Sequence, residues 1–229
     1  MTAIHHGLDR EAFFRDHTPL DAMVQQRLES DRQSDKDVLR LLYVSHYYYY
    51  YRNFETLFRA LPLLRERLGG RKVKLFLTCR LRSEENPGTY RANAAASLVT
   101  QLGIAEGIRR LQHLCDARLR GIICASLVEA MASGLPIVAA DTGVHREICQ
   151  DAAVYFPRFS PEELAERVCQ ISASDQLARK LADRGLERLR EFSWDRHVDE
   201  LLNLAGNLLA TIDPAKGCES SAGTRYKAS

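Results

Sequence analysis

Short apolar runs alternate with longer segments of helical periodicity along most of this chain. The apolar runs predict strands at residues 38–45, 73–78, 137–140 and 153–156, with a weaker strand at 108–111. Apolar residues recur at the spacing of one helical face over residues 53–68, 90–102, 161–171, 177–192 and 198–212. Strands that alternate with helices predict an α/β fold with a Rossmann-like, doubly wound parallel sheet.

One segment, residues 127–147, carries the clearest local signals. A short amphipathic helix is followed by Gly134-Leu135-Pro136, in which the glycine suits a left-handed position and the proline prevents the helix from continuing. The next residues, 137–140, are all apolar, as expected of a strand covered on both faces. Ligands of such sheets bind beyond the carboxyl ends of the strands. The residues from Asp141 onward are therefore candidates for lining a site.

The composition of the chain argues against some classes of protein, nucleic-acid-binding proteins among them. The chain has 229 residues, of which 45% are hydrophobic and 27% charged, and its formal net charge is +2. Basic and acidic residues are interspersed, which does not favour nucleic-acid binding. The six cysteines form no C-x-x-C pair, so we expect reduced thiols in preference to disulfides.

The ends of the chain differ in composition from its middle. We interpret residues 1–37 as an interdomain-type linker, residues 38–212 as one domain, and residues 213–229 as a disordered tail. His5-His6 has no third ligand at a useful spacing, and we expect a turn there and no metal site. The absence of a signal-like or membrane-length apolar run predicts a cytoplasmic protein without a transmembrane segment.

The segment Glu129-Ala130-Met131-Ala132-Ser133-Gly134-Leu135-Pro136-Ile137-Val138-Ala139-Ala140-Asp141, followed by Gly143 and Glu147, resembles the donor-site signature of family 4 (group 1) glycosyltransferases. Residues 3–14 resemble the segment in which such enzymes cross from the first domain to the second. The resemblance runs from about residue 3 to 205 and implies the C-terminal, donor-binding half of the GT-B fold. The implied activity is retaining transfer of a sugar from a nucleotide-sugar donor to an acceptor hydroxyl, with no metal and no cofactor apart from that donor.

The resemblance places the phosphate-binding cation of the family at Arg52, in an Arg52-Asn53 pair before the first long helix. Arginine is a competent bidentate phosphate ligand, and a cation at a helix start is otherwise slightly unfavourable. A second cation of the family has only His46 or a tyrosine hydroxyl as a substitute. The run Tyr47–Tyr51 can also stack on a sugar or base, and the alternative that we favour is an interface.

The resemblance also aligns Glu129 with the second glutamate of the family's E-x7-E motif, which holds the ribose hydroxyls. The alternative is a capping box, Ser126-x-x-Glu129, that satisfies amides at the helix start. The first glutamate of the motif should stand at position 121, which is Gly121. We therefore expect that one central strand and its loop are missing, on the order of 10–20 residues.

The expected deletion has a consequence for topology. The interval between the third strand and Ser126 is too short for a helix and a separate return strand, so we predict one helix over about residues 117–133. With that helix, the strand at 137–140 would lie beside the strand at 39–45.

Three functions remain open at this point. The first is the glycosyltransferase donor half, which we expect to be inactive alone because no acceptor-binding domain precedes residue 3. The second is a non-catalytic nucleotide-binding remnant, or a subunit of a split glycosyltransferase completed by a separate acceptor-binding chain. The third is a nucleotide-sugar epimerase of the same fold. In the first two, the expected partner is a nucleotide sugar.

Overall fold

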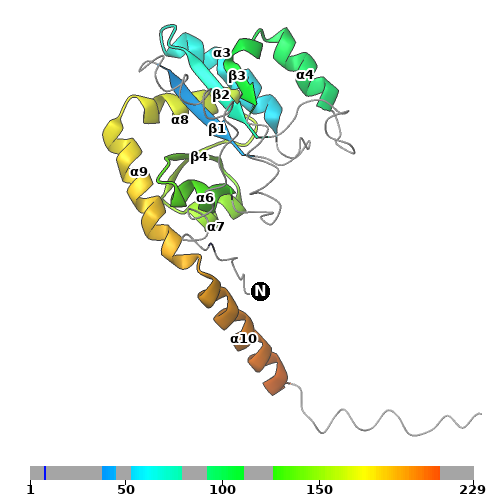
Figure 1. Cartoon of the computed structure of the whole chain (residues 1–229), viewed down its shortest axis with the longest axis vertical. Helices are drawn as coiled ribbons and strands as arrows, with labels where there is room; N and C mark the ends of the chain where they lie inside the picture. Colours follow the sequence, from blue (N-terminus) through cyan, green and yellow to red (C-terminus); the bar gives the residue numbers. More distant parts are fainter. Residues whose placement is uncertain (1–7, 9–37, 45–52, 79–91, 111–125, 212–229) are drawn as a thin grey trace, which may run out of the picture. The chain divides into compact units, whose positions relative to one another are not determined.

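The computed structural model describes Leu8 and residues 38–44, 53–78, 92–110 and 126–211 (Figure 1). Contacts divide the chain into two units, one formed by Arg10–Arg190 and the other by Met1–Asp9 with Glu191–Ser229. The predictions for residues 1–37 and 213–229 concern parts of the chain outside the described residues, apart from Leu8.

The first sheet of the larger unit contains β1 (Leu39–Tyr43), β2 (Val73–Leu77) and β3 (Ile108–Arg110). All three strands are parallel, with β2 in the middle, and Leu41 of β1 lies opposite Leu75 of β2. These three strands confirm the prediction of parallel pairing among strands separated by helices.

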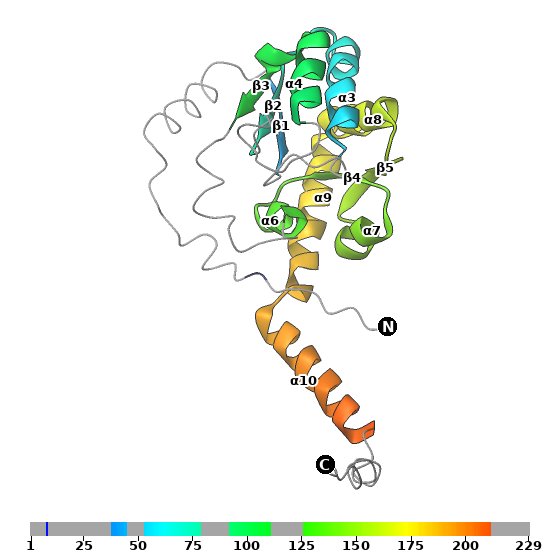
Figure 2. The same ribbon diagram turned by 90° about the vertical axis from the view of Figure 1, so that its right-hand side faces the viewer.

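Two helices lie side by side on one face of this sheet: α3 (Phe54–Arg67) and α4 (Ala92–Gln101) (Figure 2). Helix α3 buries Phe54, Phe58, Leu61 and Leu64, the face that the sequence periodicity predicts. These side chains form the centre of a core that also contains Leu75 and Leu77 of β2.

The second sheet pairs β4 (Ile137–Ala140) with β5 (Ala153–Phe156), again in parallel. Helix α6 (Ser126–Ala132) precedes β4 and α7 (Gly143–Cys149) connects the two strands. Gly134, at φ 63°, ends the α6 segment in the left-handed conformation that the sequence predicts. A connection of about a dozen residues is enough for a parallel crossover, and residues 141–152 supply it.

The predicted place of β4 beside β1 is wrong for the described strands, because β4 and β1 belong to separate sheets. The two sheets share a core through helices instead. Helix α8 (Pro161–Ser172) packs against α3, β4 and β5, and the Val138 and Ala140 side chains of β4 pack against the core around α3. Side-chain burial against α8 thus links β4 to the first sheet without backbone pairing.

The helix predicted over residues 117–133 is tested only in part, because residues 111–125 lie outside the described residues. Residues 126–132 are helical, as expected. Gly121 and the expected strand deletion also fall in the part that is not described.

Helix α9 (Asp175–Arg188) closes the larger unit and packs against α6 and α8. Gly185 makes the contact with α6 possible, since a Cβ atom there would lie 3.2 Å from Cγ of Met131. Serine side chains cap the starts of α8 and α9: Ser160 accepts a hydrogen bond from the Glu163 amide at the start of α8, and Ser174 accepts one from the Leu177 amide at the start of α9.

The smaller unit contains α10 (Trp194–Thr211), which agrees with the helix predicted over residues 198–212. Within this unit the Leu8 amide donates to the Phe192 carbonyl at 2.8 Å, and Phe192 is buried. None of the helices in the described part of the chain combines the length and apolar character required to cross a bilayer.

Candidate functional site

The carboxyl ends of the parallel strands are where an open α/β sheet offers space for a ligand. In this chain, Asn53 precedes α3, the first described helix after β1, and β5 is followed by Pro157–Ser160. The Asn53 Nδ2 atom donates to the Arg158 carbonyl at 2.5 Å. A direct hydrogen bond between Asn53 and Arg158 therefore joins the start of α3 to the chain that follows β5.

Asn53 is held by its backbone conformation and by both polar groups of its side chain. Its backbone is left-handed, with φ 52° and ψ 48°, a conformation that asparagine tolerates better than most residues. Its Oδ1 atom accepts from the Thr56 hydroxyl at 2.9 Å. The next residue, Phe54, is fully buried and meets the Tyr43 ring edge-on at a centroid distance of 4.9 Å. These contacts fix the first turn of α3 against the end of β1.

Of the predicted Arg52-Asn53 pair, the structure describes Asn53. Both polar groups of its side chain bond to protein groups, so they stabilise the contact between the start of α3 and the chain after β5. Arg52, His46 and the run Tyr47–Tyr51 lie outside the described residues, and their placement stays a prediction.

Glu129 differs from Asn53, because one oxygen of its side chain lacks a partner among the described residues. It lies in the first turn of α6 with 8% of its surface exposed, and its Oε1 atom has no hydrogen-bond partner in the described part of the chain. Burial raises the pKa of this carboxyl group above its ordinary value. Helix α6 precedes β4 and contacts it. A helix that packs back against the strand that follows it begins near the carboxyl end of that strand, so we expect the first turn of α6 at this edge.

The capping-box alternative for Glu129 requires its carboxylate to reach back to an amide at the start of α6. The buried Oε1 atom takes no such partner among the described residues. A buried carboxylate oxygen without a hydrogen bond is costly, and such atoms are uncommon in folded proteins. Glu129 is therefore the described side chain with the clearest capacity to accept a hydrogen bond from a ligand.

Sequence reasoning missed the pair Arg158-Phe159 at the same edge. Phe159 is 68% exposed, and the Arg158 guanidinium lies 4.5 Å from the centre of its ring. The pair directly follows the short strand β5, so the rule for carboxyl ends of strands could have identified it. An exposed aromatic ring stacked with a cation can cover a flat ligand group.

The residues after β4 form a second polar group at this edge. Thr142 caps α7 by accepting from the His145 amide at 3.2 Å, and His145 Nδ1 lies 2.7 Å from the Ala140 carbonyl oxygen. Asp141 accepts two hydrogen bonds from Arg146, at 2.5 and 2.7 Å, and this interaction lowers the pKa of the Asp141 carboxyl group. Asp141, which stands in the signature segment, thus forms an exposed ion pair.

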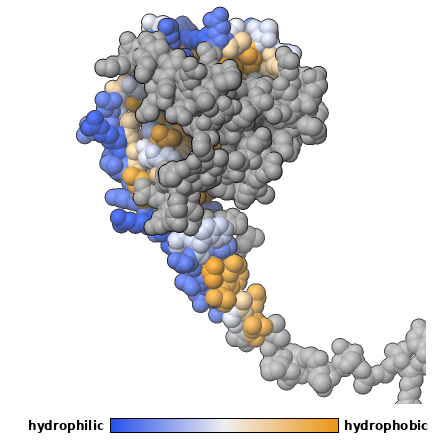
Figure 3. Space-filling model, viewed as in Figure 1, coloured by the Kyte–Doolittle hydropathy of each residue, from blue (hydrophilic) through white to orange (hydrophobic). Residues whose placement is uncertain are grey.

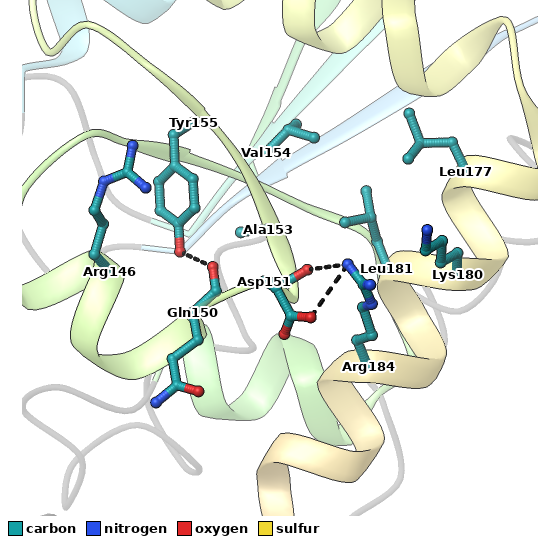
Figure 4. A pocket seen from close by; sticks show the side chains of 10 residues that line it. All are labelled: Arg146, Gln150, Asp151, Ala153, Val154, Tyr155, Leu177, Lys180, Leu181 and Arg184. Atoms are coloured by element: carbon teal, nitrogen blue, oxygen red, sulfur yellow. Dashed lines mark hydrogen bonds and ion pairs between the residues drawn. The ribbon is translucent and has the colours of Figure 1, made fainter.

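A pocket of about 520 Å³ lies elsewhere, between the start of β5, the end of α7 and helix α9 (Figure 4). Arg184 from α9 pairs with Asp151 at 3.2 Å. The guanidinium of Arg146 lies 4.4 Å from the centre of the Tyr155 ring, and the Tyr155 hydroxyl donates to the Gln150 carbonyl at 2.6 Å. Burial raises the pKa of Tyr155 to about 12, so its phenol stays protonated. Both arginines are neutralised by aspartates, and none of the predicted donor-binding residues lines this pocket.

Among the described residues, no three histidine, cysteine or acidic side chains gather closely enough to hold a metal ion. The free thiols in these residues are Cys149, which is buried, and Cys169, which is half-buried.

Comparison with known proteins gives a consistent result. A family model described as "Glycosyl transferases group 1" matches residues 39–174, more than half of the chain. The putative glycosyltransferase EpsD of Bacillus subtilis is 27% identical over 205 residues, which cover 86% of this chain and 52% of EpsD. A phosphatidyl-myo-inositol mannosyltransferase of Mycobacterium leprae is 28% identical over 120 residues, covering 44% of this chain and 32% of that protein.

Solved structures show the same fold at lower identity. A glycosyltransferase from Rickettsia africae superposes with a TM-score of 0.66 at 16% identity, covering 92% of this chain and 57% of that one. The HepE protein of Anabaena, solved in complex with UDP, gives a TM-score of 0.66 at 14% identity, covering 90% and 57%. This chain spans about half the length of EpsD and of these solved proteins. By its fold and its family match, the chain belongs to the group 1 glycosyl transferases, with the Rossmann-like architecture of GT-B enzymes.

Proposed function

We propose that this chain is the donor-binding half of a retaining family 4 glycosyltransferase and that it binds a nucleotide sugar at the carboxyl edge of its strands. The observation that carries the proposal is Glu129, a buried carboxyl group with an oxygen that lacks a partner among the described residues. A carboxylate that accepts from the two ribose hydroxyls would recover the hydrogen bonds that burial removes. The UDP complex of the HepE neighbour supports the choice of a nucleotide.

Each residue has a distinct role in this proposal. Arg52 neutralises the diphosphate, and Asn53 positions the start of α3 and the chain after β5. Glu129 holds the ribose. In the transfer step, the bond between the sugar and the diphosphate breaks and the acceptor oxygen bonds to the sugar on the same face. The acceptor proton passes to a phosphate oxygen of the departing nucleotide, so no metal is needed.

A second candidate is a subunit or remnant that binds a nucleotide without catalysing transfer on its own. The observation in its favour is that both polar groups of Asn53, a residue of the predicted donor site, already bond to protein groups. Transfer between two bound substrates requires an acceptor site and exclusion of water. A separate acceptor-binding chain would supply both.

Calorimetric titration with UDP and GDP tests binding. We expect weak binding, with Glu129→Gln reducing the affinity by about tenfold to a hundredfold through loss of a charge-assisted hydrogen bond. The matched control is Glu187→Gln, an exposed position on α9, which should leave the affinity unchanged. Arg52→Ala should weaken binding similarly, with Arg59→Ala on the exposed face of α3 as its control. Sub-micromolar binding that Arg52→Ala leaves unchanged would contradict the proposed site.

A donor-turnover assay separates the two candidates. For the isolated chain we expect slow hydrolysis of the nucleotide sugar at most, since a bound donor stays open to water. Glycosylation of an acceptor by the purified chain alone would show that it carries a complete enzyme and would overturn the half-enzyme proposal.

A further inference from the structure

The pocket between β5, α7 and α9 lies within the larger unit and has no part in the proposed nucleotide site. Its volume of about 520 Å³ is within the range of roughly 300–1,000 Å³ that is typical of sites for small molecules. In Figure 4, Arg146 of α7 and Tyr155 of β5 line one side of the pocket. Helix α9 lines the opposite side with Leu177, Lys180, Leu181 and Arg184.

Helix α9 is amphipathic, and its cations belong to its polar side. Leu181 and Gly185 are buried, whereas hydrophilic residues gather along the part of α9 that is visible at the left of Figure 3. Lys180, Arg184 and Arg188 follow one another at intervals of four residues, so they share one face of the helix. This face is therefore a row of three cations, of which the first two line the pocket.

The two arginines of this row hold α9 against the end of α7. Arg188 donates to two backbone carbonyls of α7, each at 3.1 Å. Arg184 Nη1 donates to the Asp151 carbonyl at 3.3 Å and pairs with the Asp151 carboxylate at 3.2 Å. These bonds fix one wall of the pocket and place the Arg184 guanidinium beside it.

Lys180 differs from the two arginines, because it forms no ion pair in the described part of the chain. Its ammonium group can donate three hydrogen bonds. Arg184 makes both of its contacts through Nη1, so its Nε and Nη2 atoms also have no partner among the described residues. Two cationic side chains one helical turn apart can therefore donate to the same anion.

The rest of the lining favours an anion with an organic body. Val154, Leu177 and Leu181 present apolar side chains to the pocket, and covering them removes apolar surface from water. A phosphate group carries a charge of about −1.5 to −2 at neutral pH and has three strong acceptor oxygens, enough to bond to both cations. Asp151 offsets part of the positive charge, so we expect a dissociation constant in the millimolar range.

We propose that this pocket binds a small organic phosphate, with the phosphate on Lys180 and Arg184 and the organic body against Val154, Leu177 and Leu181. The proposal does not depend on nucleotide binding, since none of the predicted donor-binding residues lines this pocket.

Calorimetric titration of the full chain with inorganic phosphate and with phenyl phosphate tests the pocket. Phenyl phosphate should bind more tightly, because its ring covers the apolar wall. Lys180→Gln should weaken the binding of phenyl phosphate by about tenfold through loss of a charge-assisted hydrogen bond, and Lys180→Arg should restore most of it. The matched control is Arg179→Gln, which removes one exposed cation of α9 that does not line the pocket and should leave the affinity unchanged.

The same titrations contain the results that would overturn the proposal. Absence of phenyl phosphate binding up to tens of millimolar overturns it, as does equal weakening by Lys180→Gln and Arg179→Gln. Equal affinity for the two probes would show binding of a simple anion without a site for an organic body. Binding that Arg52→Ala abolishes and Lys180→Gln leaves unchanged would place the phosphate at the nucleotide site instead.

Discussion

Asn53 and Glu129 are both polar residues of the candidate site, yet they differ in whether their side-chain groups have hydrogen-bond partners. Asn53 uses its amide nitrogen to bind the Arg158 carbonyl and its amide oxygen to accept from Thr56. Glu129 is more deeply buried, and its Oε1 atom has no partner among the described residues. The first side chain contributes hydrogen bonds to the folded state, whereas the second keeps an open acceptor among the described residues.

This difference distinguishes a residue that stabilises the site from a residue that is available to bind a ligand there. A side chain whose bonds are complete holds its neighbours in place and has little left to offer a ligand. A buried carboxyl group with an open acceptor costs stability, and that cost is recovered when a donor group arrives. Variants at the two positions should therefore change stability in opposite directions.

The largest expected effect is at Asn53. Asn53→Ala removes two hydrogen bonds and puts an alanine in a left-handed conformation, and we expect the free energy of unfolding to fall by about 2–4 kcal/mol. Urea denaturation followed by circular dichroism measures this change. Asn53→Gly loses the same hydrogen bonds but tolerates the backbone, so its loss should be smaller. Equal losses in the two variants would mean that the left-handed backbone at Asn53 has no measurable cost.

Glu129→Gln should have the opposite sign. Removal of a buried charge should raise the free energy of unfolding by about 1 kcal/mol at neutral pH. Because burial raises the pKa in the folded state, the penalty for the ionised Glu129 is fully present above that raised pKa. It disappears as the pH falls through the raised pKa toward the ordinary value of a glutamate.

The pH dependence gives this second prediction its control. Denaturation of wild type and Glu129→Gln at neutral pH and again near the ordinary pKa of glutamate should show the gap in stability closing at the acid end. A gap that is constant with pH would show that the variant acts by some means other than removal of a charge.

The smallest effect is expected at Arg158. Asn53 bonds to the backbone carbonyl of Arg158, so Arg158→Ala keeps that hydrogen bond and loses the stacking on the exposed Phe159 ring. We expect a loss of about 0.5 kcal/mol in the same urea experiment. A loss as large as that of Asn53→Ala would show that the side chain of Arg158, and not its carbonyl, joins the start of α3 to the chain after β5.

The sequence predicted the local elements of this fold well. Strand β5 has the predicted bounds, and Gly134 has the left-handed conformation expected of the residue that ends α6. Each of these features depends on a few neighbouring residues: apolar periodicity, a capping side chain or a glycine. The family signature around Glu129 was equally local, which is why the family could be recognised before the fold was known.

Tertiary structure decided how those elements meet. In the folded chain β4 pairs with β5 and not with β1. The Asn53 side chain joins the start of α3 to the chain after β5, more than a hundred residues away. Folding also buries Glu129, whose cost depends on how many atoms from other elements exclude water from its carboxyl group. Local patterns determine backbone conformation because their interactions lie within a few residues. Strand pairing and desolvation depend on contacts between distant segments, so they were settled only by the folded chain.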